Sequence, residues 1–237
     1  MEPPEEPAEV PFEVPFEAAE WAMQLAVHAE KTDPPAHSAV CAAAAMAVAR
    51  VLIKPDEQWQ EAVRRWESGP IRKVTRRARG VRWPAVQGLP GVTVEWAGAE
   101  VRAFVPGPVT RVPLELARLQ VAGLDLPDDP AAAPEAPEPP YAAIALNPNA
   151  RMSTGKAAAQ CGHAAHLLVR LAAKRDRSAW LAAGAPVHVV RSGTAQAWSR
   201  AVAGAAVTVR DAGFTEVPAG TITAVARIVR AAPRRSE

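Results

Sequence analysis

Two short blocks in the last third of the chain carry residue types that hydrolytic chemistry uses. They are Gly155-Lys156-x-x-x-Gln160-Cys161-x-His163-Ala164 and Asp211-x-Gly213-x-Thr215, the second followed by Pro218-x-Gly220-Thr221. A lysine at the start of a helix and an aspartate at the end of a strand suit the attack of water on an acyl or phosphoryl group. The ammonium group balances a developing anion, and the carboxylate orients or deprotonates the water.

The first block predicts a helix with one polar face. Lys156, Gln160 and His163 are spaced i, i+4 and i+7, so they share a face. The opposite face carries small apolar residues that let the helix lie close to a sheet. Lys156 falls in the first turn, where unpaired backbone N–H groups and the helix dipole favour an anion. We therefore expect this face to line a site for a phosphate or an oxyanion.

The second block follows a predicted strand over residues 206–209. Asp211 should emerge at the carboxyl end of that strand, with Gly213 and Thr215 on the loop that follows. If the predicted strand over residues 141–146 runs parallel to it, both blocks meet at the same edge of the sheet. Thr215 would then hold the water or the substrate beside Lys156 and Asp211. This site uses water and needs neither a metal nor another cofactor.

Other interpretations of these residues remain open. Lys156 also fits a solvated first-turn residue, Asp211 a turn residue, and His163 a helix histidine with a structural partner. A nucleophilic Cys161 activated by His163 is disfavoured, because residues i and i+2 point to different sides of a helix. Zinc bound by Cys161, His163 and His166 is disfavoured too, because the spacing matches no common ligand set.

The hydrophobic pattern predicts alternating strands and helices in the C-terminal half, and hence a small layered α/β fold with a parallel or mixed sheet. Ser153 or Thr154 and, later, Thr194 are predicted helix caps. The expected elements are a strand over 141–146, a helix from 155 to about 173, a short helix over 176–183, a strand over 187–190, a helix over 194–203, and strands over 206–209 and 222–229.

Two segments rich in proline divide the chain. Residues 1–20 combine glutamate and proline without any basic residue, which predicts a disordered tail, and residues 127–140 predict an extended linker. They leave two lobes, 21–126 and 141–230, and a short tail over 231–237.

The first lobe is predicted to be a degenerate copy of the second, over about residues 21–110. Trp21 aligns with Tyr141 and Cys41 with Cys161, both at an offset of 120, and residues 92–98 resemble 207–213 at an offset of 115. At these offsets the candidate site residues of the second lobe are not retained in the first lobe. The residues that align with Lys156, Gln160, His163, Asp211 and Thr215 are Ala36, Val40, Ala43, Trp96 and Glu100. We expect an inactive lobe whose apolar helix face packs on the other lobe, as in a covalent pseudo-dimer.

Composition bounds the class of protein. The chain has 237 residues, 49 % of them hydrophobic and 22 % charged, with a net charge of only +2, so no global field recruits an anionic polymer. Both cysteines lie in apolar patterns and are expected to be buried without a disulfide. No signal peptide or membrane span is recognisable in the sequence, which predicts a cytoplasmic protein with no membrane partner.

The two blocks together resemble the type II peptidyl-tRNA hydrolases, over roughly residues 141–230. The resemblance implies a three-layer α/β/α fold around a mixed four-stranded sheet, and cleavage of the ester between peptide and tRNA in translation and ribosome rescue. It places the catalytic residues at Lys156, Asp211 and Thr215, supported by Gln160, His163, Gly155 and Gly213. A tRNA-binding protein without turnover and an acyl hydrolase of another ester are the alternatives. We expect the chain to act as a monomeric pseudo-dimer or a homodimer.

The sequence departs from the family in residues that are expected to bind the substrate. Arg151-Met-Ser-Thr precedes the Gly-Lys pair where further basic residues are common, and Asn147-Pro148-Asn149 replaces a loop that usually contains an aspartate. A basic segment in the first lobe, from Arg72 to Arg82, could bind the substrate instead, although its pattern also fits a solvated surface. We expect it, with Arg151, to hold the phosphates of the tRNA acceptor stem through Arg72, Lys73, Arg76, Arg77, Arg79 and Arg82.

Overall fold

The computed structural model describes residues 20–128, 134–191 and 193–232. Apart from Glu20, the predicted tail over 1–20 lies outside the described residues, as do 129–133 of the predicted linker and 233–237 of the second tail. We refer to residues 20–126 as the N-terminal lobe and to residues 141–232 as the C-terminal lobe.

The N-terminal lobe is built on a sheet in which the basic segment forms an edge strand, β2. Asp56 caps the second helix by accepting the backbone N–H of Trp59. In chain order the elements are β1 (Trp21–His28), α1 (His37–Leu52), α2 (Glu57–Glu67), β2 (Arg72–Ala78), α3 (Arg82–Val86), β3 (Gly91–Trp96), β4 (Ala99–Phe104), β5 (Gly107–Pro108), a 3-10 turn (Val109–Arg111) and α4 (Leu114–Ala117).

The C-terminal lobe contains the elements that the sequence predicts, with bounds that differ by a few residues at most. Ser153 caps α5 by accepting the backbone N–H of Lys156, and Thr194 caps α7 by accepting that of Ala197. The elements are β6 (Tyr141–Leu146), α5 (Thr154–Leu171), α6 (Lys174–Ala182), β7 (Val187–Arg191), α7 (Ala195–Ala203), β8 (Val207–Arg210) and β9 (Ile222–Val229).

The two lobes share one topology. The N-terminal sheet has the strand order β2-β1-β4-β3, and the C-terminal sheet has the order β7-β6-β9-β8. In each sheet the first strand of the lobe pairs in parallel with one neighbour and antiparallel with the other, and a final antiparallel pair completes the sheet. The predicted mixed four-stranded sheet is confirmed in the C-terminal lobe. The N-terminal sheet has the same order of its four main strands, with the short β5 added beside β1.

One alignment made from the sequence is wrong. The β3–β4 connection is a two-residue turn, Ala97-Gly98, with both φ angles positive, whereas β8 and β9 are joined by a long loop over 211–221. Glu100 lies in β4, the counterpart of β9, and therefore does not correspond to Thr215. The constant offset fails because the loop is longer in one copy. The N-terminal lobe lacks the segment that carries Gly213 and Thr215.

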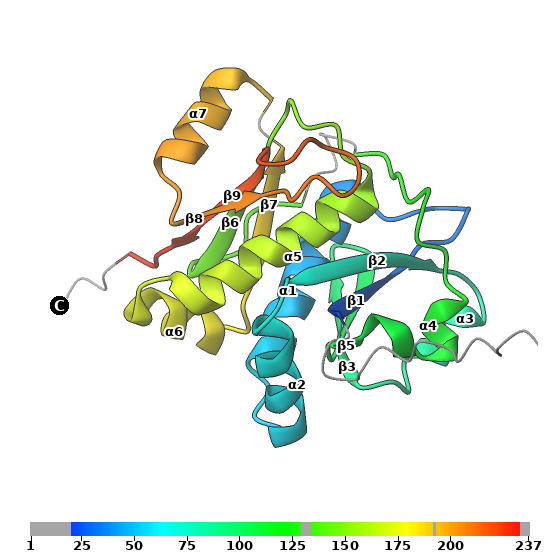
Figure 1. Ribbon diagram of the computed structural model, residues 1–237. Coiled ribbons are helices and arrows are strands. Elements are labelled where there is room, and N and C mark those ends of the chain that lie inside the picture. Colours follow the sequence, from blue (N-terminus) through cyan, green and yellow to red (C-terminus); the bar gives the residue numbers. More distant parts are fainter. Residues whose placement is uncertain (1–19, 129–133, 192, 233–237) are drawn as a thin grey trace, which may run out of the picture.

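Helices α1 and α5 lie side by side between the two sheets (Figure 1). Helix α1 packs on β3 and β4 and reaches β7, while α5 packs on β8 and β9 and reaches β2 of the other lobe. Every residue of α1 except Arg50 is buried. The alanines along both helices allow this close approach, and one hydrophobic core runs through both lobes.

The outer faces of the two sheets are covered differently. On the N-terminal sheet, a second apolar cluster beneath α3 and α4 includes Trp83, Leu116 and Leu119. On the C-terminal sheet, α7 lies opposite α5 and has no fully buried residue (Figure 1). None of the described helices is by itself long and apolar enough to cross a membrane, although α1 and α2 meet the criterion as a pair bent by 111°.

Gly162 lies at a tightly packed point of the interface between the two lobes, which we call the seam. A Cβ atom there would lie 3.1 Å from a methyl group of Val48 on α1 and 3.2 Å from Cδ of Lys73 on β2. The glycine therefore leaves room for the side-chain stem of Lys73 beside α5.

Replacing Gly162 with leucine should destabilise the protein by about 1–3 kcal/mol, because the larger side chain overpacks the seam. The control is Gly69→Leu, since a Cβ atom at Gly69 meets nothing within 4 Å. Its free energy of unfolding should change by no more than about 0.5 kcal/mol. Urea unfolding of both variants measures the difference, and equal stabilities would contradict the packing described here.

Candidate functional site

The structure brings Lys156, Asp211 and Thr215 together at the start of α5. The Lys156 ammonium nitrogen lies 2.5 Å from Oδ2 of Asp211 and donates a hydrogen bond of 2.8 Å to Oγ1 of Thr215. The side chains of Lys156 and Asp211 are 13 % and 5 % exposed, so the ion pair is well shielded from water. Strands β6 and β8 both run antiparallel to β9, and hence in the same direction as each other, which brings the two blocks to one edge of the sheet.

The loop between β8 and β9 is closed at its base by backbone hydrogen bonds. The N–H of Asp211 donates to the carbonyl of Thr221, and the N–H of Gly220 donates to the carbonyl of Asp211. Within the loop, Oδ1 of Asp211 accepts the backbone N–H of Gly213 at 2.8 Å. Gly213 has a φ of +83°, and a Cβ atom there would lie 2.7 Å from the backbone nitrogen of Ala219, so this position requires glycine.

Two successive buried hydrogen bonds, through Gln160 and Thr223, hold Asp211 on the side away from the loop; we call them the relay. Gln160 donates from Nε2 to Oδ2 of Asp211 at 2.8 Å, and its Oε1 accepts the hydroxyl of Thr223 at 2.7 Å. Thr223 is completely buried on β9. The carboxylate of Asp211 therefore receives donors from Gly213, Gln160 and Lys156, which fixes its orientation and leaves it acting only as an acceptor.

The first turn of α5 differs from the sequence expectation. We expected unpaired backbone N–H groups there to receive an anion, but the N–H of Gly155 donates to the carbonyl of Leu124, and that of Lys156 donates to Oγ of Ser153. Glu216 in turn accepts from the N–H and the hydroxyl of Ser153, at 2.6 and 2.7 Å. Protein groups thus occupy backbone donors of this turn, and the positive charge that remains at the start of α5 is that of the Lys156 side chain.

Sequence reasoning missed several residues that shape the site. Glu216 ties the loop to the start of α5, Thr223 orients Gln160, and Leu126 donates its N–H to Oγ1 of Thr154 at 2.8 Å. Glu216 follows Thr215 directly, which is a weak local signal. The contact between Ser153 and Glu216 spans 63 positions, and no local spacing predicts it.

His163 does not join Lys156 and Gln160 at Asp211. Its Nδ1 lies 3.2 Å from the ammonium nitrogen of Lys73 on β2, and the Lys73 nitrogen lies 4.6 Å from the ring centre of Trp66. Burial lowers the pKa of Lys73 well below its usual value. Burial, and next the charge of Lys73, hold the pKa of His163 well below its usual value. His163 is therefore a neutral side chain of the seam between the lobes.

The two histidines considered as zinc ligands have separate partners, His163 at Lys73 and His166 at Glu67. Nε2 of His166 lies 2.6 Å from Glu67, and its ring stacks on Trp66. Burial, and next the charge of Lys73, lower the pKa of His166 to about 4 despite the Glu67 carboxylate. Cys161 and Cys41 are both buried and free, as the sequence predicts.

The basic residues of β2 and its surroundings have partners within the protein. Arg72 forms an ion pair of 2.5 Å with Glu20. Arg151 is exposed in the loop before α5. The other contacts run from Arg76 Nε to Gln24 at 2.8 Å, from Arg77 to the side chain of Gln120, from Arg79 Nε to the carbonyl of Ala29 at 2.9 Å, and from Arg82 to the carbonyl of Arg118 at 2.9 Å.

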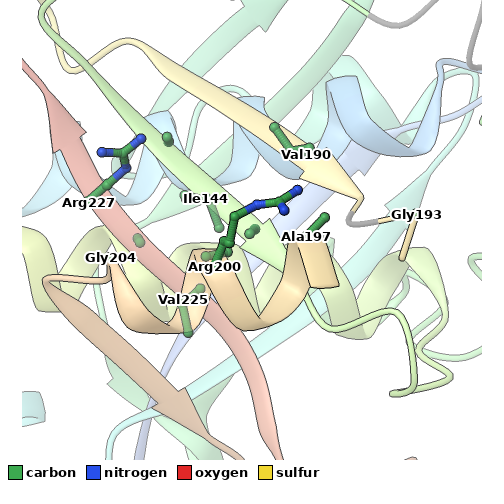
Figure 2. A pocket seen from close by; sticks show the side chains of 12 residues that line it. Ile144, Val190, Gly193, Ala197, Arg200, Gly204, Val225 and Arg227 are labelled. Atoms are coloured by element: carbon green, nitrogen blue, oxygen red, sulfur yellow. The ribbon is translucent and has the colours of Figure 1, made fainter. Parts of the chain in front are cut away.

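A cavity of about 530 Å³ lies between α7 and the outer face of the C-terminal sheet (Figure 2). Its wall is mostly alanine, valine and isoleucine, with Arg200 and Arg227 as the charged residues. It shares none of its lining with the cluster of Lys156, Asp211 and Thr215. The cavity is separate from the candidate site.

The family model of the peptidyl-tRNA hydrolase PTH2 matches residues 142–229. The matched segment covers all four strands of the C-terminal sheet except Tyr141, the first residue of β6. It includes Lys156, Asp211 and Thr215. The N-terminal lobe lies outside it. Searches of curated proteins and of solved structures found no match.

The low pKa values of His163 and His166 predict that the protein loses stability in mild acid. The unfolded chain binds protons as the pH falls through 6.5, whereas the folded chain resists protonation of His166 until about pH 4 and holds the pKa of His163 low as well. The free energy of unfolding should therefore fall between pH 6.5 and 4, by up to about 1.4 kcal/mol per pH unit for each histidine.

Urea unfolding at pH 7 and pH 5 measures this loss. The variant His163→Gln with His166→Gln should show a smaller loss than the unaltered protein. An equal loss in both proteins would contradict the assignment of these two histidines as neutral groups in the folded protein.

Proposed function

We propose that this chain, whose residues 142–229 match the peptidyl-tRNA hydrolase PTH2 family, hydrolyses the ester bond that joins a peptide to the 3′ end of tRNA. The observation that carries the proposal is the contact of Lys156 with both Asp211 and Thr215. This cluster lies within the matched segment, and it combines a cation, a carboxylate acceptor and a hydroxyl at one point.

The proposed reaction needs only water as a second reactant. Asp211 accepts a hydrogen bond from the water and orients it toward the ester carbonyl, using the capacity that Oδ1 retains beside Gly213. Lys156 stabilises the oxyanion that forms on the carbonyl oxygen, and Thr215 positions the substrate or the water. The bond between the acyl carbon and the 3′ oxygen of the ribose then breaks, and the leaving oxygen takes up the proton that the attacking water gives up. The products are a peptide with a free carboxyl group and a tRNA with a free 3′ hydroxyl.

The relay behind Asp211 supports this role. Gln160 and Thr223 hold the carboxylate without neutralising it, because both are uncharged. A carboxylate fixed in this way does not need to reorganise as charge develops on the substrate, which is where preorganised sites gain most of their effect.

Hydrolysis of N-acetylaminoacyl-tRNA tests the proposal. Lys156→Ala and Asp211→Ala should each lower kcat/KM by roughly 10²- to 10⁴-fold, because one removes the cation at the oxyanion and the other removes the acceptor for water. Lys174→Ala is the matched control, since Lys174 also lies in the first turn of a helix, α6, and is exposed. It should hydrolyse the substrate at the unaltered rate.

Free aminoacyl-tRNA, tested in parallel, should be a poor substrate. If the unaltered protein releases nothing from either tRNA yet binds both, the chain is a tRNA-binding protein that kept the fold. If it cleaves simple acyl esters as well as the tRNA ester, it is a general acyl hydrolase. Either result overturns the proposed function.

We further propose that basic residues around β2 and before α5 hold phosphates of the acceptor stem. The exposed members Arg82 and Arg151 test this without disturbing buried groups. Replacing both with glutamine should weaken tRNA binding and reduce the salt slope of log K by about 1 for each phosphate that is no longer neutralised. Arg175→Gln on α6, also exposed, is the control and should leave affinity and slope unchanged. An unchanged slope in the double variant would rule out binding of phosphates by these two arginines.

A further inference from the structure

One aromatic ring is exposed on the loop that carries the candidate site. Phe214 lies between Gly213 and Thr215 and is 76 % exposed, so it takes no part in the core. Its neighbour Thr215 accepts the hydrogen bond from Lys156. The ring therefore stands one residue away from the point where the ester carbonyl would be bound.

The partner of this ring comes from the other lobe. The guanidinium carbon of Arg72, the first residue of β2, lies 5.5 Å from the centre of the Phe214 ring. Arg72 is itself held in place, because it forms an ion pair with Glu20 and its carbonyl accepts the indole N–H of Trp66 at 3.1 Å. The N-terminal lobe thus supplies a fixed cation beside the ring.

An exposed aromatic ring beside an arginine is the arrangement that binds unpaired nucleobases. The ring offers a stacking surface, and the guanidinium adds a cation–π contact and a positive charge near the phosphate backbone. Specific recognition of RNA mostly concerns unpaired ends and loops, whose bases are free to stack in this way. The nucleobase is present in every such substrate, whereas the side chain of the peptide changes from one substrate to the next.

We propose that Phe214 and Arg72 bind the nucleobase of the 3′-terminal nucleotide, whose ribose carries the ester. The inference rests on the proposed function, because it takes the ester carbonyl to lie at Lys156 and Thr215. The base of that nucleotide is one sugar away from the carbonyl, and Phe214 is one residue away from Thr215. The N-terminal lobe, which lacks the catalytic residues, then takes part in recognising the substrate.

Two esters that differ only in the terminal base test the pair. Both carry the same N-acetylaminoacyl group, one on a short RNA ending in CCA and the other on the same RNA with an abasic 3′ residue. Phe214→Ala should lower kcat/KM about 5- to 100-fold for the CCA ester and leave the abasic ester unchanged. Phe214→Trp should keep most of the activity, because a larger ring still stacks. Phe214→Leu should behave like the alanine variant.

Arg72→Gln should lower kcat/KM for the CCA ester by a smaller factor. In a double variant with Phe214→Ala, Arg72→Gln should cause a smaller further loss of kcat/KM than it causes alone, because the two residues act on one base. An equal loss on both esters in Phe214→Ala would overturn the proposal, since the loop would then matter for the chemistry and not for the base. A loss that depends on the acyl group and not on the base would show that the ring binds the peptide, and would overturn it too.

Binding of the unacylated CCA and abasic RNAs to the Lys156→Ala variant, followed by fluorescence anisotropy, separates this inference from the proposed function. Tighter binding of CCA that disappears when Phe214→Ala is added supports the stacking pair even if the unaltered protein hydrolyses neither ester. Equal binding of both RNAs, with hydrolysis intact, leaves the proposed function standing and overturns the stacking pair.

Discussion

The burial of α5 between two sheets is the constraint on which the rest of the structure depends. A helix covered on one side needs a single apolar stripe, but α5 meets β8 and β9 on one side and α1 and β2 on the other. Small residues and Gly162 make this possible, and each polar side chain of the helix needs a partner within the protein. Lys156 and Gln160 find theirs at Asp211, while His163 and His166 find theirs in the N-terminal lobe.

The difference between the two lobes lies in a loop more than in the sheets. Both sheets have the same strand order, yet one joins its last two strands by Ala97-Gly98 and the other by the segment over 211–221. The two-residue turn of the N-terminal lobe is too short to carry an aspartate, a glycine and a threonine to the start of a helix, as the loop over 211–221 does. The N-terminal lobe therefore serves as a support for α5, and its edge strand brings Arg72 and Lys73 to the other lobe.

Much of the C-terminal lobe could be predicted from the sequence, because its signals are local. Ser153 and Thr194 mark helix starts, and the apolar runs give the strands almost to the residue. The approach of Lys156 to Asp211 followed from the rule that ligands bind at strand ends. The partners of Gly155, Ser153 and His163 could not be predicted, since Leu124, Glu216 and Lys73 lie far away in the sequence. The offset that aligned Glu100 with Thr215 failed because residue spacing does not record a lengthened loop.

The segment after α4 contacts the starts of both central helices. Leu124 and Leu126 hold the first turn of α5, and Asp128 accepts the N–H and the hydroxyl of Ser38 at the start of α1. Two separate chains with the same interface would part on dilution, and the donors at the start of α5 would then open to water. Here the partner lobe is present at a fixed effective concentration set by the connection itself. The contacts at the start of α5 are thus made within one chain.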